Sequence, residues 1–246
     1  MQRLLTCFLL ALLGACSATA QQRAAPADAV FRIEPARPVE QLLPLALAAT
    51  PPHETGEFHP SDLVELVTLD PTLRLDIRYA GTRNFLGVAL YSQPRAFLQR
   101  PAAEALARVQ RALATEGLGL LVHDGYRPWY VTKMFWDATP VEQHRFVADP
   151  AKGSRHNRGC AVDLTLVDLS TGKELEMPSL YDEFSERAYP DWSGGSATAR
   201  ANRDRLRQHM EREGFTVYQY EWWHFDYRGW QAWPIGNQRF EDLGAR

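Results

Sequence analysis

The chain has 246 residues, 45% hydrophobic and 23% charged, and this globular composition excludes a disordered or collagen-like protein. The 27 Lys and Arg residues against 30 Asp and Glu give a formal charge of −3 and no basic footprint for nucleic acid, so no nucleic-acid partner is expected. Three cysteines are too few for a disulfide framework.

Residues 1–20 have the order of an export signal. Arg3 precedes an apolar run, Leu4–Leu13, that is too short to span a bilayer, and small residues follow it. The stretch Leu13-Gly14-Ala15-Cys16 resembles a bacterial lipobox, in which Cys16 becomes the lipidated first residue of the mature protein. Cleavage after Ala20 and a buried N-terminal helix are the alternatives. We therefore expect an exported, periplasmic protein that a lipid on Cys16 holds at a membrane.

Residues 21–60 are rich in proline and alanine, and they predict an extended, semi-rigid tether. A short helix over Val39–Ala49 is an alternative, although Pro44 would interrupt it. The chain is therefore expected to consist of an export signal (1–20), a tether (21–60) and one domain (61–246).

From residue 61 onward, strands and helices interleave. Hydrophobic periodicity predicts strands over residues 63–67, 73–79, 118–123, 161–167, 215–220 and 222–225. Capping residues and spacing predict helices over residues 101–116, 131–136 and 202–213. Because several strand connections are short enough for hairpins, we expect an α+β fold with a mainly antiparallel central sheet flanked by helices.

Two histidines and an aspartate form a candidate metal site. His156 lies in a polar loop, Asp163 follows inside a strand, and His224 closes the sequence Glu221-Trp222-Trp223-His224. Two His and one Asp suit Zn²⁺ and leave a fourth position open for water, as catalytic zinc sites do. An unpaired carboxylate at Asp163 would be costly to bury, and either a metal or an arginine would offset that cost.

Three motifs occur together: S-x-H-x-x-G-x-A-x-D (154–163), E-W-W-H (221–224) and D-G-Y-R-P (124–128). They resemble the zinc D-alanyl-D-alanine dipeptidases, the family of the vancomycin-resistance dipeptidase, within the D,D-carboxypeptidase-like metallopeptidases. The resemblance covers about residues 62–240. It implies a single zinc-peptidase domain.

The resemblance also implies site residues. One Zn²⁺ per chain would have the ligands His156, Asp163 and His224. Glu221 would be the general base, and Arg127 would stabilise the transition state. On a regular strand Glu221 and His224 face opposite sides, so a bulge or turn between them is required.

Three further positions are implied to bind the substrate. Ser154 matches a serine that holds the substrate carboxylate, Asp182 an acid near the substrate ammonium, and Tyr79 a tyrosine lining the pocket. Cys160 stands where relatives have a small residue, which favours a packing role over thiol ligation.

The resemblance favours zinc-dependent hydrolysis of D-alanyl-D-alanine, a small dipeptide, to two D-alanines, in turnover or scavenging of cell-wall peptides. One alternative is a peptidoglycan D,D-carboxypeptidase or L,D-endopeptidase. Another is a non-catalytic zinc- or peptidoglycan-binding lipoprotein, against which Glu221 and Arg127 argue because pure binding needs neither. The sequence leaves the oligomeric state open.

Overall fold

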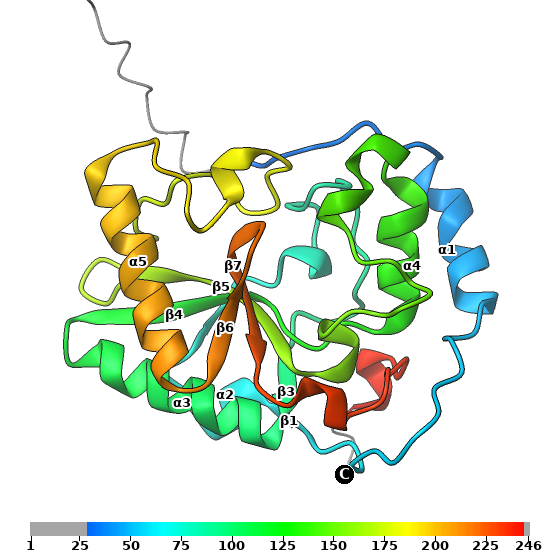
Figure 1. Cartoon of the computed structure of the whole chain (residues 1–246), viewed down its shortest axis with the longest axis horizontal. Coiled ribbons are helices and arrows are strands. Elements are labelled where there is room, and N and C mark those ends of the chain that lie inside the picture. The colour runs from blue at the N-terminus through cyan, green and yellow to red at the C-terminus, as the bar shows by residue number, and fades with distance from the viewer. Residues whose placement is uncertain (1–28, 244–246) are drawn as a thin grey trace, which may run out of the picture.

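The computed structural model of the protein describes residues 29–243. A five-stranded sheet runs through the middle of the molecule (Figure 1). The strand order is β2-β4-β5-β7-β6, and β2 is parallel to β4 while the other neighbours are antiparallel. These strands span Arg74–Leu75 (β2), Leu118–Asp124 (β4), Ala161–Asp168 (β5), Phe215–Tyr218 (β6) and Glu221–Tyr227 (β7). A second sheet pairs β1 (Leu63–Glu65) with β3 (Phe97–Gln99). The predicted α+β fold with a mainly antiparallel central sheet is confirmed.

The helices flank this sheet. They span Val39–Ala48 (α1), Leu66–Leu69 (α2), Arg100–Ala114 (α3), Trp129–Ala138 (α4) and Ala197–Arg212 (α5). The helices α3 and α5 contact each other and the sheet, whereas α1 and α4 lie together on the opposite side of the molecule (Figure 1). Within residues 29–243, no helix combines the length and the apolar character that a membrane crossing requires.

The two faces of the sheet have different chemistry because side chains alternate along each strand. On β5, Val162, Leu164 and Leu166 are fully buried in the hydrophobic core. The residues between them point to the other face, where Asp163 pairs with His224 of β7 across the ladder. The polar face of β5 and β7 therefore carries two of the predicted metal ligands.

The described part of the predicted tether, residues 29–60, differs from an extended chain. The helix α1 forms despite Pro44 in its interior, and it packs against α4. Val39, Leu42 and Ala46 follow helical spacing and are buried, and this burial offsets the cost of the proline. The domain therefore begins before residue 61.

The predicted strand over residues 73–79 is also shorter in the structure. Only Arg74 and Leu75 pair with β4, and the chain then turns into a short 3₁₀ helix, Arg78–Ala80. The buried Arg78 guanidinium pairs with Asp76 at 2.9 Å and with Glu174 at 3.3 Å. These contacts favour the turn over a longer strand, and the turn places Tyr79 near the polar face of the sheet.

His123, on β4, should make stability depend on pH. Burial, together with the nearby Arg78 guanidinium, lowers the pKa of its imidazole to about 3, against 6.5 as the ordinary value. Between these values the unfolded chain binds a proton that the folded chain does not, so the free energy of unfolding falls as the pH falls. The slope from this group is at most about 1.4 kcal/mol per pH unit.

We therefore expect His123→Gln to flatten this dependence. Urea unfolding of metal-free wild type and variant between about pH 7 and pH 4 measures the difference between the two slopes. Parallel curves would show that the pKa of His123 is the same in the folded and the unfolded chain.

Candidate active site

His156, Asp163 and His224 meet at one point on the polar face of the sheet. Asp163 Oδ1 lies 3.2 Å from His156 Nε2 and 3.0 Å from His224 Nδ1, and the two ring nitrogens are 3.0 Å apart. All three residues are buried. One ligand atom from each lies within 4.8 Å of the other two, a spacing that suits a single metal ion.

The outward atoms of the two imidazoles fix their tautomers. His156 Nδ1 lies 2.7 Å from the carbonyl oxygen of Gly125, and His224 Nε2 lies 2.9 Å from Asp226 Oδ1. Because both outward nitrogens donate to oxygen acceptors, both inward nitrogens carry lone pairs in the neutral rings.

These lone pairs face a third acceptor. Asp163 Oδ1 is buried and has no hydrogen-bond partner within residues 29–243. Three acceptor atoms facing one another repel unless a cation lies among them, and imidazole nitrogen with carboxylate oxygen is a donor set that zinc accepts. The residues present therefore fit a divalent metal ion.

Local backbone features bring the ligands together. His156 begins a 3₁₀ turn that ends at Gly159, whose φ of 67° is left-handed. A Cβ at this position would approach Leu63 Cδ2 to 2.5 Å, which explains the glycine of the S-x-H-x-x-G motif.

The bulge expected between Glu221 and His224 is present in β7. Val217 of β6 pairs with Phe225, but the next residue, Tyr218, pairs with Glu221. The extra residues on β7 turn Glu221 toward the ligands, and its Oε2 lies 3.7 Å from His224 Nδ1. The expected bulge is therefore confirmed.

The Glu221 carboxyl has a pKa suited to proton transfer. Burial raises this pKa to about 7; the neighbouring His224 and Arg127 oppose the rise, while Asp163 and Asp226 add to it. A carboxyl that titrates near neutrality can take up a proton and release it again under ordinary conditions.

Arg127 is fixed beside the metal ligands. Its Nε and one terminal nitrogen lie 2.9 and 2.7 Å from Asp124 Oδ2, and that terminal nitrogen is 3.6 Å from Asp163 Oδ2. The guanidinium lies over the rings of Phe135, at 4.6 Å, and Tyr79, at 5.3 Å. A buried, immobile cation at this place can stabilise negative charge that develops near the metal.

Tyr79 and Asp182 form another wall of the site. The Tyr79 hydroxyl lies 2.9 and 3.0 Å from the two carboxylate oxygens of Asp182. Asp182 has a φ of 60°, the only positive φ of a non-glycine residue within residues 29–243. Burial, and then repulsion from Asp163, raises the pKa of Asp182 well above its usual range.

One cavity joins the predicted residues. Its volume is about 100 Å³, and its walls include all eight predicted site residues of the domain: Tyr79, Arg127, Ser154, His156, Asp163, Asp182, Glu221 and His224. Cys160 is fully buried and lies outside the ligand cluster, while Cys16 lies outside the described residues.

Sequence reasoning missed several supporting residues. Tyr181 donates a hydrogen bond to Asp163 Oδ2 at 2.9 Å, and Tyr91 donates one to Asp124 Oδ1 at 2.7 Å. Asp226 was detectable, because it lies two residues after His224 and therefore on the same face of the strand. Tyr91 is distant in sequence and gave no such signal.

Removing the charge of Asp226 should weaken metal binding. We expect Asp226→Asn to lower the metal affinity about 10- to 100-fold, because the carboxylate orients His224 and increases the basicity of its inward nitrogen. Competition with a chromogenic chelator measures the affinity. Asp168→Asn, at the far end of β5, is the matched control, and an equal affinity in both variants would contradict this role.

Comparisons with known proteins agree with the site. A family model described as D-ala-D-ala dipeptidase matches residues 59–243. The D-alanyl-D-alanine dipeptidase of Escherichia coli (strain K12) is 36% identical over 180 residues, 73% of this chain and 92% of that protein. The like-named protein of Enterococcus faecium is also 36% identical, over 171 residues, 62% of this chain and 85% of its own. The resemblance drawn from the three motifs is thus confirmed, and the chain belongs to the D-alanyl-D-alanine dipeptidase family of metallopeptidases.

Proposed function

We propose that this protein uses one zinc ion to hydrolyse D-alanyl-D-alanine to two molecules of D-alanine. The observation that carries the proposal is the grouping, in one small cavity, of the ligand cluster, Glu221, Arg127 and the buried acid Asp182. The ligand cluster, Glu221 and Arg127 provide the groups that peptide hydrolysis requires. The buried acid Asp182 favours a substrate with a free amino group, because the ammonium can pair with its carboxylate.

The residues divide the chemistry among them. A zinc ion held by His156, Asp163 and His224 would polarise the peptide carbonyl and lower the pKa of water from 15.7 to about 7. Glu221 takes the proton of the attacking water and delivers it to the leaving nitrogen. Arg127 stabilises the negative charge on the former carbonyl oxygen, because its guanidinium is already oriented by Asp124.

Asp182 would recognise the ammonium end of the dipeptide. Within residues 29–243 its buried carboxyl is bonded only by the Tyr79 hydroxyl, and its raised pKa reflects how poorly a negative charge is compensated there. A substrate ammonium would supply the missing positive charge. A peptidoglycan D,D-carboxypeptidase or L,D-endopeptidase would instead meet an amide at this point, which leaves the carboxylate uncompensated.

Zinc-loaded protein should release D-alanine from D-alanyl-D-alanine and act at least about 100-fold more slowly on the N-acetylated dipeptide. The acetyl group removes the ammonium charge and so leaves Asp182 buried without a counterion. Chromatographic detection of D-alanine measures both rates. No release from the free dipeptide would overturn the proposal, and equal rates would favour the carboxypeptidase.

Glu221→Gln separates catalysis from binding alone. This variant keeps the shape of the side chain but cannot accept the proton, so turnover should fall about 10²- to 10⁴-fold. Bound zinc, measured by elemental analysis, should remain at one ion per chain. Unchanged turnover would assign the general base elsewhere, and loss of zinc would make Glu221 a ligand.

We also propose export, with a lipid on Cys16 that anchors the protein in the periplasm. The support is the sequence of residues 1–20, in which an apolar run leads to the lipobox-like Leu13-Gly14-Ala15-Cys16. An enzyme in that compartment would meet dipeptide released from the cell wall, which favours a role in turnover or scavenging.

Cys16→Ala tests the anchor. Wild-type protein produced in a bacterial host should incorporate labelled palmitate and sediment with membranes, whereas the variant should do neither. Cys160→Ala is the matched control, because this thiol is buried within the domain. Palmitate on the Cys16→Ala variant would refute lipidation at Cys16.

A further inference from the structure

Arg155 is a cation of the catalytic pocket that neither the proposed mechanism nor the resemblance uses. It directly precedes His156, and its side chain lines the same cavity as the metal ligands. The backbone holds it in place, since its carbonyl oxygen accepts hydrogen bonds from the Arg158 and Cys160 N–H groups, both at 3.1 Å. Its guanidinium lies over the ring of Trp230, 5.0 Å from the ring centroid.

The hydrogen-bonding capacity of Arg155 is mostly unused. Its Nε is buried, lies 3.5 Å from Asp226 Oδ2, and makes no hydrogen bond within residues 29–243. Asp226 also accepts the hydrogen bond from His224 through its other oxygen, Oδ1. A guanidinium carries five N–H donors, so Arg155 can receive a second carboxylate while it stays beside Asp226.

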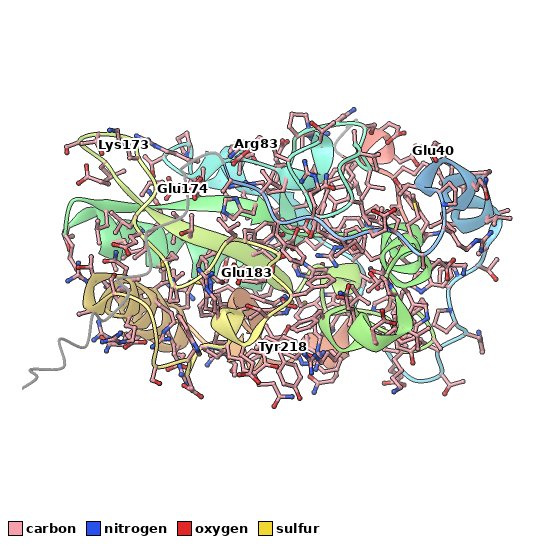
Figure 2. The ribbon with its side chains drawn as sticks, turned by 90° about the horizontal axis from the view of Figure 1, so that it is seen from above. Glu40, Arg83, Lys173, Glu174, Glu183 and Tyr218 are labelled. Carbon is pink, nitrogen blue, oxygen red and sulfur yellow. The ribbon has the colours of Figure 1, made fainter. Side chains whose placement is uncertain are left out.

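Arg155 and Asp182 lie on different sides of the ligand cluster. Asp182 adjoins Tyr79 and Tyr181, and the Tyr181 hydroxyl contacts Asp163. Arg155 instead adjoins Asp226, behind His224, and lies over Tyr218 at 5.9 Å. In Figure 2, Glu183, the residue after Asp182, lies near the middle of the view and Tyr218 lies near its lower edge. A dipeptide whose ammonium lies at Asp182 would thus direct its carboxylate toward Arg155.

We propose that Arg155 binds the C-terminal carboxylate of the substrate and so selects a dipeptide with a free carboxyl end. This inference rests on the proposed function. Ser154, the residue implied for this task, has a neutral hydroxyl that already accepts a hydrogen bond from the His156 N–H at 3.2 Å. Arg155 supplies the positive charge that a carboxylate requires, and Ser154 adds a neutral contact.

Arg145 is the matched control, since it lines the same cavity. Its guanidinium lies over Phe146, and Phe146 stacks on Phe184, two residues after Asp182. Arg145 therefore lies toward the side of the ammonium, where a second cation would not bind the carboxylate.

The test compares D-alanyl-D-alanine with D-alanyl-D-alaninamide, whose C-terminus is neutral. We expect Arg155→Gln to lower kcat/KM for the free acid about 10- to 100-fold, mainly through KM, and to leave the amide nearly unchanged. Arg155→Lys keeps the charge and should restore part of the preference for the acid. Arg145→Gln should alter both substrates alike.

If Arg155→Gln lowers kcat/KM equally for the acid and the amide, Arg155 has only a structural role. If Arg145→Gln instead lowers kcat/KM selectively for the acid, Arg145 is the residue that binds the carboxylate. Calorimetric binding of the two compounds in the Glu221→Gln background gives the same comparison without turnover. Failure of the wild type to release D-alanine would overturn the proposed function, whereas the binding preference would still decide the role of Arg155. Thermal unfolding verifies that each variant is folded.

Discussion

The structure depends on one electrostatic constraint: three buried acceptor atoms are directed at a common point. Asp163 Oδ1, His156 Nε2 and His224 Nδ1 lie within about hydrogen-bond distance of one another, yet the tautomers leave no proton between the two imidazoles. Such an arrangement is unfavourable without a cation. The turn that ends at Gly159 and the bulge in β7 serve this convergence. With an ordinary loop and a regular strand in their place, the ligand atoms would point away from one another.

A ring of outer contacts holds the acceptors in their orientations. The Gly125 carbonyl fixes one imidazole, Asp226 fixes the other, and Tyr181 occupies the second oxygen of Asp163. Asp124 has a similar effect on Arg127, and Tyr91 in turn bonds Asp124. The groups proposed to react are therefore oriented before a substrate arrives, which reduces the reorganisation that the reaction requires.

The sequence was informative where local chemistry decides the structure. The ligand motifs, the helix after Pro101 and the need for a bulge before His224 all depend on neighbouring residues, and the structure contains each of them. It was less informative where distant segments decide. The burial of α1 depends on α4, about ninety residues later, and the end of β2 depends on the ion pair of Arg78 with Glu174. No periodicity along one segment encodes a partner that far away.

If Cys16 carries a lipid, the packing of α1 against α4 limits how far the catalytic pocket can lie from the membrane surface. The segment from Phe31 to Ala48 belongs to the body of the domain, since Phe31, Ile33 and the buried face of α1 join its core. If Cys16 carried a lipid, only the chain between Cys16 and residue 29 would remain as a linker between the membrane and the domain. Even fully extended, thirteen residues span about 45 Å. The catalytic pocket would draw its substrate from a thin layer beside the membrane and not from the whole compartment.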